Sequence, residues 1–481
     1  MWITERYKKL GVGVKASIVY TVASLLTRGL AIITTPIFTR MLTSSQMGTV
    51  TLYNSWYSMI SVIATLSLTS GGFQIAMKEY EGRRDEYVSS VLSITSLMSI
   101  IIGVIYFVAP RFWQEWMGLS NKLILLMLIG FFVSPASDFW MAKQRYEYKY
   151  RLVGIVSIVT AVLASAASVL VVIYMNTKQS AYAAEGRLFA NYSVVYGAAA
   201  IIWIYLFVKG KTIFSKDFWR FSLSISIPLV GYALARQVLE VSDRTMISYY
   251  IGKSEVGIYS LLYTVSSLSL LVWNAINSSF IPYLYQNMDK KKYEKSIQNI
   301  STGLLATYAL VAVSITFFAP EIVRILATEE YFEAVYIAPP IAAGVFLTSV
   351  SHMYSNVLLY YKKSVVIMIS SVIAAIVNVV LNAVFIPRIG YQAAAYTTLV
   401  AYIILAGVEG ILAAKTYKKI NGRKMIVYNN YYIFFLSLGT IILCMSALFL
   451  YQNAVLRYIL AISIASIAVV CLVKIKKGKG K

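Results

Sequence analysis

Long apolar stretches separated by short polar gaps recur from one end of the chain to the other. A helix rises about 1.5 Å per residue, so about 20 apolar residues cross a hydrocarbon core about 30 Å thick. The pattern therefore predicts an all-α, polytopic membrane protein with about 14 transmembrane helices. The predicted spans are residues 17–38, 48–70, 88–109, 123–142, 152–175, 188–208, 222–250, 256–280, 297–319, 338–361, 365–386, 392–414, 431–450 and 456–473.

Lysine and arginine are concentrated in every second gap between these stretches. Of the 43 basic residues, 31 lie in the gaps on the side of the N-terminus or in the C-terminal tail, nine lie in the alternate gaps, and three lie within spans. Short loops rich in lysine and arginine stay in the cytoplasm, so both termini are predicted to be cytoplasmic. The net charge of +23 follows from this topology, and no nucleic-acid partner is expected.

The composition agrees with a membrane protein. Hydrophobic residues make up 59% of the chain, charged residues 13%, and the mean hydropathy is +0.70. Because no gap is long enough to form a soluble domain, we expect the function to lie within the membrane. Cys444 and Cys471 fall in apolar spans and are interpreted as packing residues, and the single histidine leaves no basis for a metal site.

Three sequence windows occur twice, in the same order. Residues 47–50 resemble 256–259, residues 107–110 resemble 317–320, and residues 130–138 resemble 344–352. The repeat makes the first six spans the counterpart of the next six and, because six is even, gives both halves the same orientation. We expect an N-terminal lobe over 1–208, a C-terminal lobe over 209–414 and, in 415–481, two further helices and a basic cytoplasmic tail.

Two six-helix lobes around a central cavity are typical of transporters that rock between inward-open and outward-open states. Charged side chains within spans are the best guides to such a cavity, because an arginine at the bilayer centre costs about 2.5–3.5 kcal/mol or more without water or a partner. Arg28 lies roughly 20 Å into the first span, counted from Lys15. It either pairs with a carboxylate on another helix or lines the cavity for an anionic substrate.

The repeat aligns Arg28 with Gln237, the neighbour of Arg236. Guanidinium groups bind phosphate oxygens bidentately, so Arg28 and Arg236 are candidates to hold a diphosphate from two sides. The further candidates for cavity charges are Glu240, Asp243, Arg244, Asp138 and His352. Glu240 can instead neutralise the arginines four residues before and after it, and His352 can equally be a hydrogen-bonded packing residue.

Aromatic residues on one face of the second span and of its repeat counterpart are candidates for sugar contacts. They are Tyr53, Trp56, Tyr57, Tyr259 and Tyr263. The alternative is that they belong to the membrane core packing or to the aromatic belts at the membrane surface.

Catalytic motifs are lacking in the sequence. Residues 210–212 imitate the end of a phosphate-binding loop, but Tyr205 occupies the position of its first glycine. The first external turn, residues 43–46, has no acidic residue of the kind expected in a polyprenyl-sugar glycosyltransferase. The chain is therefore predicted not to be an enzyme, and a membrane glycan polymerase or transferase is disfavoured.

Several motifs carry a family resemblance. They are residues 34–42 with 47–48, residues 243–244 followed by 252 and 256–259, and Asn378 and Asn382 followed by 387–390 and 393–395. With them, residues 10–420 resemble the polysaccharide-export flippases of the multidrug/oligosaccharidyl-lipid/polysaccharide (MOP) exporter superfamily. The resemblance implies transfer of an undecaprenyl-diphosphate-linked oligosaccharide across the bacterial cytoplasmic membrane, for O-antigen, capsule or exopolysaccharide synthesis.

The same resemblance implies that the protein contacts membrane lipid. It also implies the polymerase and chain-length proteins of the same polysaccharide pathway as partners. No cofactor is expected. A proton or sodium gradient and removal of the product are both open as sources of energy.

Two related transport functions are alternatives. Multidrug exporters of the superfamily carry cations and rely on acidic cavity residues, an option that Asp138 keeps open, although mid-membrane arginines would repel a cation. Lipid II flippases share the 14-helix layout, but the resemblance would lead us to expect cavity arginines in the second and eighth spans, which have none.

Overall fold

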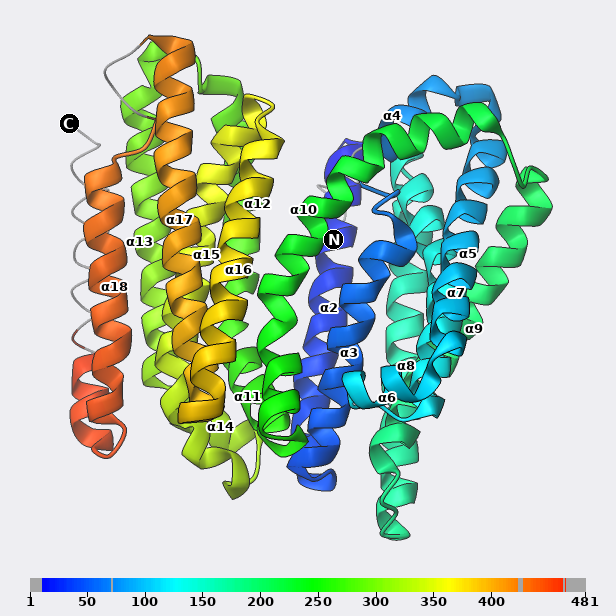
Figure 1. Ribbon diagram of the computed structural model, residues 1–481. Coiled ribbons are helices and arrows are strands. Elements are labelled where there is room, and N and C mark those ends of the chain that lie inside the picture. The colour runs from blue at the N-terminus through cyan, green and yellow to red at the C-terminus, as the bar shows by residue number, and fades with distance from the viewer. Residues whose placement is uncertain (1–10, 71, 423–426, 462, 464–481) are drawn as a thin grey trace, which may run out of the picture. The chain divides into compact units, whose positions relative to one another are not determined.

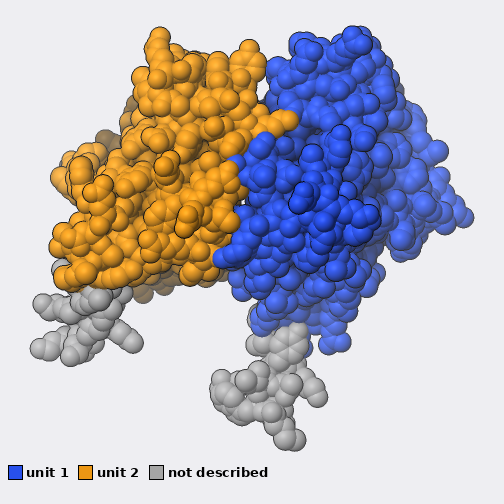
Figure 2. Space-filling view, turned by 90° about the horizontal axis from the view of Figure 1, so that it is seen from below, with its two compact units in different colours: residues 1–237 blue, residues 238–481 orange. Residues whose placement is uncertain are grey.

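The structure is a computed structural model that describes residues 11–70, 72–422, 427–461 and 463. Every regular element in these residues is a helix (Figure 1). The chain divides into two compact units, Met1–Gln237 and Val238–Lys481 (Figure 2). The boundary between them falls inside a helix, and the lobes at 1–208 and 209–414, which rest on the sequence repeat, stay a prediction.

In its described residues, unit 1 contains six long helices, two eight-residue helices, one three-residue 3₁₀ helix and the first part of a further long helix. They are α2 (Val12–Met41), α3 (Ser44–Thr65), α4 (Gly72–Glu79), η1 (Glu81–Arg83), α5 (Arg84–Val108), α6 (Pro110–Met117), α7 (Asn121–Tyr146), α8 (Tyr150–Thr177), α9 (Ala183–Gly210) and α10 (Lys216–Tyr250). Helix α8 packs against both α2 and α9, and α9 also packs against α7. Helix α7, which also packs against α5 and α3, is the most buried of the membrane-spanning helices described in unit 1.

Unit 2 contains the end of α10 and the remaining helices. They are α11 (Lys253–Ser267), α12 (Ser269–Asn287), η2 (Lys291–Tyr293), α13 (Glu294–Phe317), α14 (Ala319–Leu326), η3 (Glu329–Ile337), α15 (Ala338–Tyr360), α16 (Ser364–Ile389), α17 (Gln392–Asn421) and α18 (Asn430–Leu450). Helix α15 packs against α11, α13, α17 and α18. Its side chains are almost all buried, so α15 forms the core of unit 2.

The same order of elements occurs in both units. A short 3₁₀ turn (η1, η2) leads into a long helix (α5, α13), which is followed by an eight-residue helix (α6, α14) and another long helix (α7, α15); unit 2 adds η3 between α14 and α15. Proline stands in the first turn of both short helices, where its missing N–H is not needed. The repeated sequence windows thus fall on equivalent elements.

Helix α3 begins at a capping box. Thr43 Oγ1 accepts from the Gln46 backbone N–H at 3.2 Å, and the Gln46 side chain accepts from the Thr43 N–H at 3.1 Å. Two backbone donors that the first turn leaves without partners are thereby satisfied. The short turn between α2 and α3 is fixed by this exchange, and α3 starts at a defined residue.

Twelve helices in the described part of the chain are long and apolar enough to cross a membrane. The all-helical, polytopic membrane fold is confirmed. Two of the 14 predicted spans are not among these twelve. Helix α3, which corresponds to span 48–70, has 22 residues but is more polar than the others, and span 456–473 lies mostly outside the described residues.

Candidate functional site

Arg28 lies near the middle of α2, on a helix that buries little of its surface in the protein. Its side chain is exposed, and it forms no hydrogen bond, ion pair or ring contact with any described residue. The interpretation that Arg28 pairs with a carboxylate on another helix finds no partner in the described part of the chain. An exposed cation at this depth is available to an anion.

Arg236 lies on α10 and is also exposed, although it is not without interactions. The adjacent Gln237, which the repeat aligns with Arg28, donates from Nε2 to Ser58 Oγ of α3 at 2.8 Å. No contact in the described part of the chain joins Arg28 to Arg236, so a diphosphate held from two sides stays a prediction.

Asp243 is the best-defined buried charge in unit 2, with 1% of its surface exposed. One carboxylate oxygen accepts from Tyr259 Oη and Thr398 Oγ1, each at 2.6 Å. The other accepts from Asn382 Nδ2 at 2.7 Å and, more weakly, from Asn378 Nδ2 at 3.3 Å. Four donors from three other helices therefore compensate a charge that would be very costly in a membrane interior.

This cluster, which we call the Asp243 network, depends on a simple spacing. Asn378 and Asn382 are four residues apart, so they lie on the same face of α16, and Asn382 also donates to Asn378 Oδ1 at 3.2 Å. Asn378 Oδ1 in turn accepts from Ser242 Oγ at 2.7 Å. The two asparagines entered the sequence analysis only as part of a motif. Their i,i+4 spacing in an otherwise apolar span is the signal that points to a buried polar partner.

The neighbouring charges of α10 do not pair as their spacing allows. Arg244 donates from Nη1 to the backbone oxygen of Glu240 at 2.9 Å, and its guanidinium carbon lies 4.5 Å from the centre of the Tyr263 ring. The Glu240 carboxylate is exposed and forms no ion pair with a described residue. Helix α10 therefore presents Glu240 to its surroundings, while Arg244 is held by backbone and aromatic contacts.

Among the candidates for sugar contacts, Tyr259 is fully buried and its hydroxyl is bonded to Asp243, and Tyr263 is 8% exposed beneath Arg244. In unit 1, Trp56 is buried and donates from Nε1 to the Met117 carbonyl at 3.1 Å. These three side chains already have partners within the protein, as the packing alternative expects.

Tyr53 and Tyr57 belong to an aromatic cluster between α3, α7 and α9. Tyr53 is fully buried and its hydroxyl lies 3.1 Å from that of Tyr196, while Tyr57 stacks on Phe131 with ring centres 5.2 Å apart. Tyr192 lies 5.1 Å from Tyr53, measured between ring centres. The partly exposed Tyr57 is the candidate that stays accessible to a ligand.

The close packing of this cluster requires a glycine. A Cβ at Gly130 would collide with the Tyr196 hydroxyl and would lie 2.9 Å from a ring carbon of Tyr57. Gly344, its counterpart in the repeat, has Tyr402 at a similar place, with Cδ2 at 3.1 Å from an added Cβ. At the equivalent positions Gly130 and Gly344, each unit therefore has a glycine where a tyrosine ring packs closely against a helix backbone.

We expect Gly130→Ala to lower the stability of the protein by about 1–3 kcal/mol, the usual cost of overpacking. The matched control is Gly197→Ala on α9, which meets nothing within 4 Å and should be neutral or slightly stabilising because alanine favours helix. Thermal unfolding of both variants in detergent measures the difference. Equal unfolding temperatures would contradict the packing described for Gly130.

Asp138 and His352, equivalent in the repeat, have different surroundings. Asp138 is exposed on α7 and forms no hydrogen bond or salt bridge with a described residue. His352 is half-buried on α15, and its Nδ1 accepts from Trp273 Nε1 at 3.2 Å. The packing interpretation of His352 therefore has an identified partner, whereas Asp138 stays a candidate for a cavity charge.

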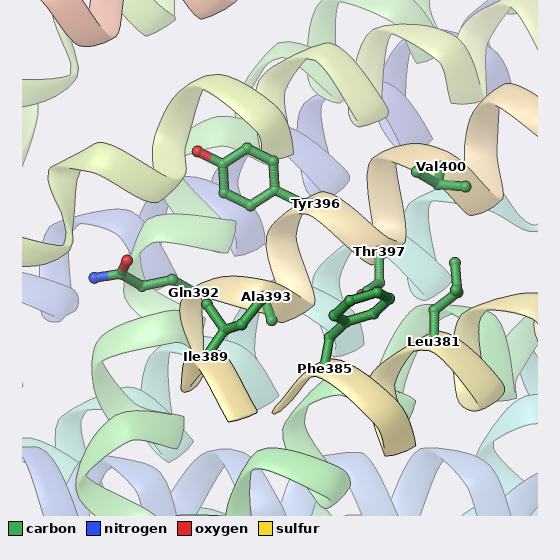
Figure 3. Close-up of a pocket in the computed structure, with 8 residues that line it drawn as sticks. All are labelled: Leu381, Phe385, Ile389, Gln392, Ala393, Tyr396, Thr397 and Val400. Atoms are coloured by element: carbon green, nitrogen blue, oxygen red, sulfur yellow. The ribbon is translucent and has the colours of Figure 1, made fainter. Parts of the chain in front are cut away.

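Two recesses of unit 2 are lined mainly by hydrocarbon. The first, of about 460 Å³, lies between α16 and α17, where Leu381 and Phe385 face Thr397 and Val400 (Figure 3). Thr397 turns its hydroxyl toward Asn382, so the Asp243 network lies behind this wall. The recess is suited to a hydrocarbon chain and offers nothing to a diphosphate.

The second recess, of about 640 Å³, lies between α15, α17 and α18, and we call it the α18 groove. Its walls are apolar from Ile403 to Ile411 on α17 and, apart from Ser437, from Ile433 to Ile441 on α18. Lys415 and Asn430 lie together at one end, where α17 approaches its end and α18 begins. The groove is therefore mainly apolar along its length and polar at one end.

A family model described as "Polysaccharide biosynthesis protein" matches residues 14–288, more than half of the chain. The chain belongs to this family. A second model, MatE, matches residues 228–384. The resemblance to polysaccharide flippases of the MOP superfamily is therefore confirmed, and with it a membrane transporter rather than an enzyme.

Two named proteins are similar in sequence to this chain over most of its length. The chain is 21% identical over 405 residues to the probable low-salt glycan biosynthesis flippase Agl15 of Haloferax volcanii, with 81% of each chain covered. It is 22% identical over 418 residues to the Lsg locus putative protein 1 of Haemophilus influenzae, covering 83% of this chain and 95% of that protein.

Two solved structures share the fold. The lipid II flippase MurJ in an inward closed conformation superposes with a TM-score of 0.66 at 15% identity, covering 95% of this chain and 100% of MurJ. An inward-facing multidrug resistance MATE family transporter superposes with a TM-score of 0.61 at 14% identity, covering 85% of this chain and 100% of that transporter. At such low identity these likenesses concern the fold alone.

Proposed function

We propose that the protein is a flippase that moves a polyprenyl-diphosphate-linked oligosaccharide across the bacterial cytoplasmic membrane by alternating access, with both termini in the cytoplasm. The glycan would serve O-antigen, capsule or exopolysaccharide synthesis. The observation that carries the proposal is the family match over residues 14–288, supported by a relative named as a glycan biosynthesis flippase along 81% of the chain.

The diphosphate is the part of this substrate that most needs a defined site, because it carries charge through the membrane. We place the diphosphate site on α2 because of Arg28. The Arg28 side chain is exposed near the middle of this membrane-spanning helix and has no partner among the described residues. A guanidinium pairs with phosphate oxygens in a planar, bidentate geometry that an ammonium does not provide.

The α18 groove is our proposed path for the polyprenyl tail. Its apolar walls match a hydrocarbon chain, and the exposed Lys415 at its polar end places a positive charge where an anionic head group would leave the groove. From Ile403 to Lys415 the helix rises about 18 Å, so the groove accommodates several isoprene units.

A bulky residue in the groove tests this path. Gly407→Phe places a ring in the groove at a position where an added Cβ meets nothing within 4 Å, so the fold should tolerate it. We expect translocation to slow by about 10–100-fold, since a lost apolar contact of this size is worth about 1.5–3 kcal/mol. The control is Gly439→Phe on α18, at a similarly open position outside the groove lining. Equal slowing by both variants would contradict the path.

The function itself is tested by deleting the gene in its host and identifying the lipid-linked glycan that accumulates in the inner leaflet. The purified protein in proteoliposomes should then move that glycan, and an imposed proton or sodium gradient distinguishes gradient-driven transport from pull by product removal. Accumulation of no lipid-linked glycan, together with new sensitivity to cationic drugs, would replace the proposal with a multidrug exporter.

A further inference from the structure

Unit 1 contains a polar pocket of about 210 Å³ that the sequence analysis did not identify. It lies between α2, α3, α8 and α9, and we call it the Arg187 pocket. Its polar lining consists of Thr34, Asn54, Ser165, Ser168, Arg187, Asn191 and Tyr192. Unlike the two apolar recesses of unit 2, it presents hydroxyl, amide and guanidinium groups.

The charge of the pocket is positive. Arg187 is half-buried, and its guanidinium carbon lies 3.6 Å from the centre of the Phe38 ring while Nη1 lies 3.1 Å from Met47 Sδ. These contacts hold the guanidinium against the pocket wall. No aspartate or glutamate is among the lining residues, so the charge contributed by the lining side chains is that of Arg187.

The amides add hydrogen-bond donors to this charge. Tyr192 donates to Asn54 Oδ1 at 2.8 Å, which uses the amide oxygen and leaves the amide nitrogen of Asn54 without an acceptor among the described residues. Asn191 and Ser165 form no side-chain hydrogen bond with any described residue. Asn54 is exposed, and Asn191 and Ser165 are half-buried, so a ligand or water can reach these side chains.

The pocket also lies close to Arg28. Ala31, one of its lining residues, is three residues after Arg28, so the two are neighbours on α2 about 4.5 Å apart along the helix axis. Thr34 and Phe38 continue the lining away from Arg28 along the same helix. A group covalently attached to a diphosphate at Arg28 would therefore reach the pocket within one or two helical turns.

We propose that the Arg187 pocket binds one acidic sugar of the translocated glycan, close to its diphosphate end, through a carboxylate or phosphate on the sugar. The inference rests on the proposed function and adds the substrate class. The volume equals roughly seven water molecules at ~30 Å³ each, about the space of one sugar ring with its substituents. Arg187 pairs with the acidic group, and the amides of Asn54 and Asn191 bond the ring hydroxyls.

Site-directed labelling tests the pocket directly in the full-length protein. A single cysteine is introduced as Ser165→Cys in a background that carries Cys444→Ala and Cys471→Ala, and its alkylation by a maleimide is followed with glucuronic acid, glucose or inorganic phosphate present. Glucuronic acid should slow the alkylation severalfold, and glucose should not. Equal protection by glucose and glucuronic acid, equal protection by phosphate and glucuronic acid, or no protection would overturn the proposal.

Variants of the lining connect the labelling to the named residues. Arg187→Gln should weaken protection by glucuronic acid about tenfold or more, the loss expected for a charge-assisted hydrogen bond. Asn191→Ala leaves the contact between Arg187 and Phe38 in place and should weaken protection severalfold without changing thermal stability. The control is Arg111→Gln on α6, an exposed arginine without a partner among the described residues. Unchanged protection in both lining variants would overturn the assignment.

A transport assay tests the acidic-sugar pocket separately from the proposed flippase function. In proteoliposomes, Arg187→Gln should reduce translocation of a glucuronate-containing lipid-linked glycan and leave that of a matched neutral glycan unchanged. If the unmodified protein moves both glycans and Arg187→Gln moves them equally well, the inference fails and the flippase function stands. If the unmodified protein moves neither, the proposed function fails.

Discussion

Arg28→Ala abolishes most translocation of a diphosphate-linked glycan while the protein remains as abundant and as stable as the unmodified chain. We expect a loss of about 10–100-fold, because a hydrogen bond between charged groups contributes about 1.5–3 kcal/mol. Stability should not change because the Arg28 side chain is exposed and has no partner among the described residues. Removing it therefore breaks no contact of the fold.

Arg28→Lys distinguishes the geometry of the guanidinium from its charge. Lysine keeps the charge but not the planar pair of donors, so we expect partial activity between that of Arg28→Ala and that of the unmodified protein. Translocation is measured in proteoliposomes, and protein amount and thermal stability are measured in parallel. The control is Arg111→Ala, which removes another exposed arginine outside the proposed site. Full activity of Arg28→Lys together with reduced abundance of Arg28→Ala would leave the phosphate role unsupported.

Asp243→Ala has the largest expected effect on stability. The substitution leaves the buried donors of Tyr259, Asn382 and Thr398 without their acceptor, and each buried donor without an acceptor costs about 1–3 kcal/mol. We expect a loss of several kcal/mol, observed as a much lower unfolding temperature in detergent and as reduced abundance in the membrane. Asp243→Asn should be intermediate, because it keeps one acceptor oxygen but replaces the other with a donor.

Glu240→Gln is the matched control for Asp243. Glu240 lies three residues earlier on the same helix, and its carboxylate is exposed without an ion pair among the described residues. A surface change of this kind is expected to alter stability by no more than about 0.5 kcal/mol. If Asp243→Ala unfolded like Glu240→Gln, the Asp243 network would not stabilise unit 2 as its geometry indicates.

The helices could be predicted from the sequence because hydrophobic length is a local property. An apolar stretch of a given length and the charges of its flanking gaps are readable without knowing which helices pack together. Span 48–70 is predicted like the others, but the serine, threonine, asparagine and glutamine residues of helix α3 make it more polar than the other spans. The short amphipathic helix α6, which follows Ala109, was taken as part of a gap between spans.

The candidate site was predictable only in part, because the partners of a buried polar group are distant in sequence. The sequence points to Arg28 because it lies near the middle of the first span, and the structure adds that its side chain is exposed. The surroundings of Asp243 could not be derived in this way, since Asn382 and Thr398 follow it by 139 and 155 residues. The Arg187 pocket was missed for the same reason: its lining comes from four helices, each of which looks unremarkable alone.

The distant partners of Asp243 have a consequence for the order in which the protein is made. At a synthesis rate of about 5–20 residues per second, the 155 residues between Asp243 and Thr398 take roughly 8 to 30 s to appear. From the synthesis of Tyr259 until that of Asn378, which is most of this interval, Tyr259 is the one of the four donors that has been made, so the Asp243 carboxylate is incompletely hydrogen-bonded. The Asp243 network can therefore be completed only after α16 and α17 have been made.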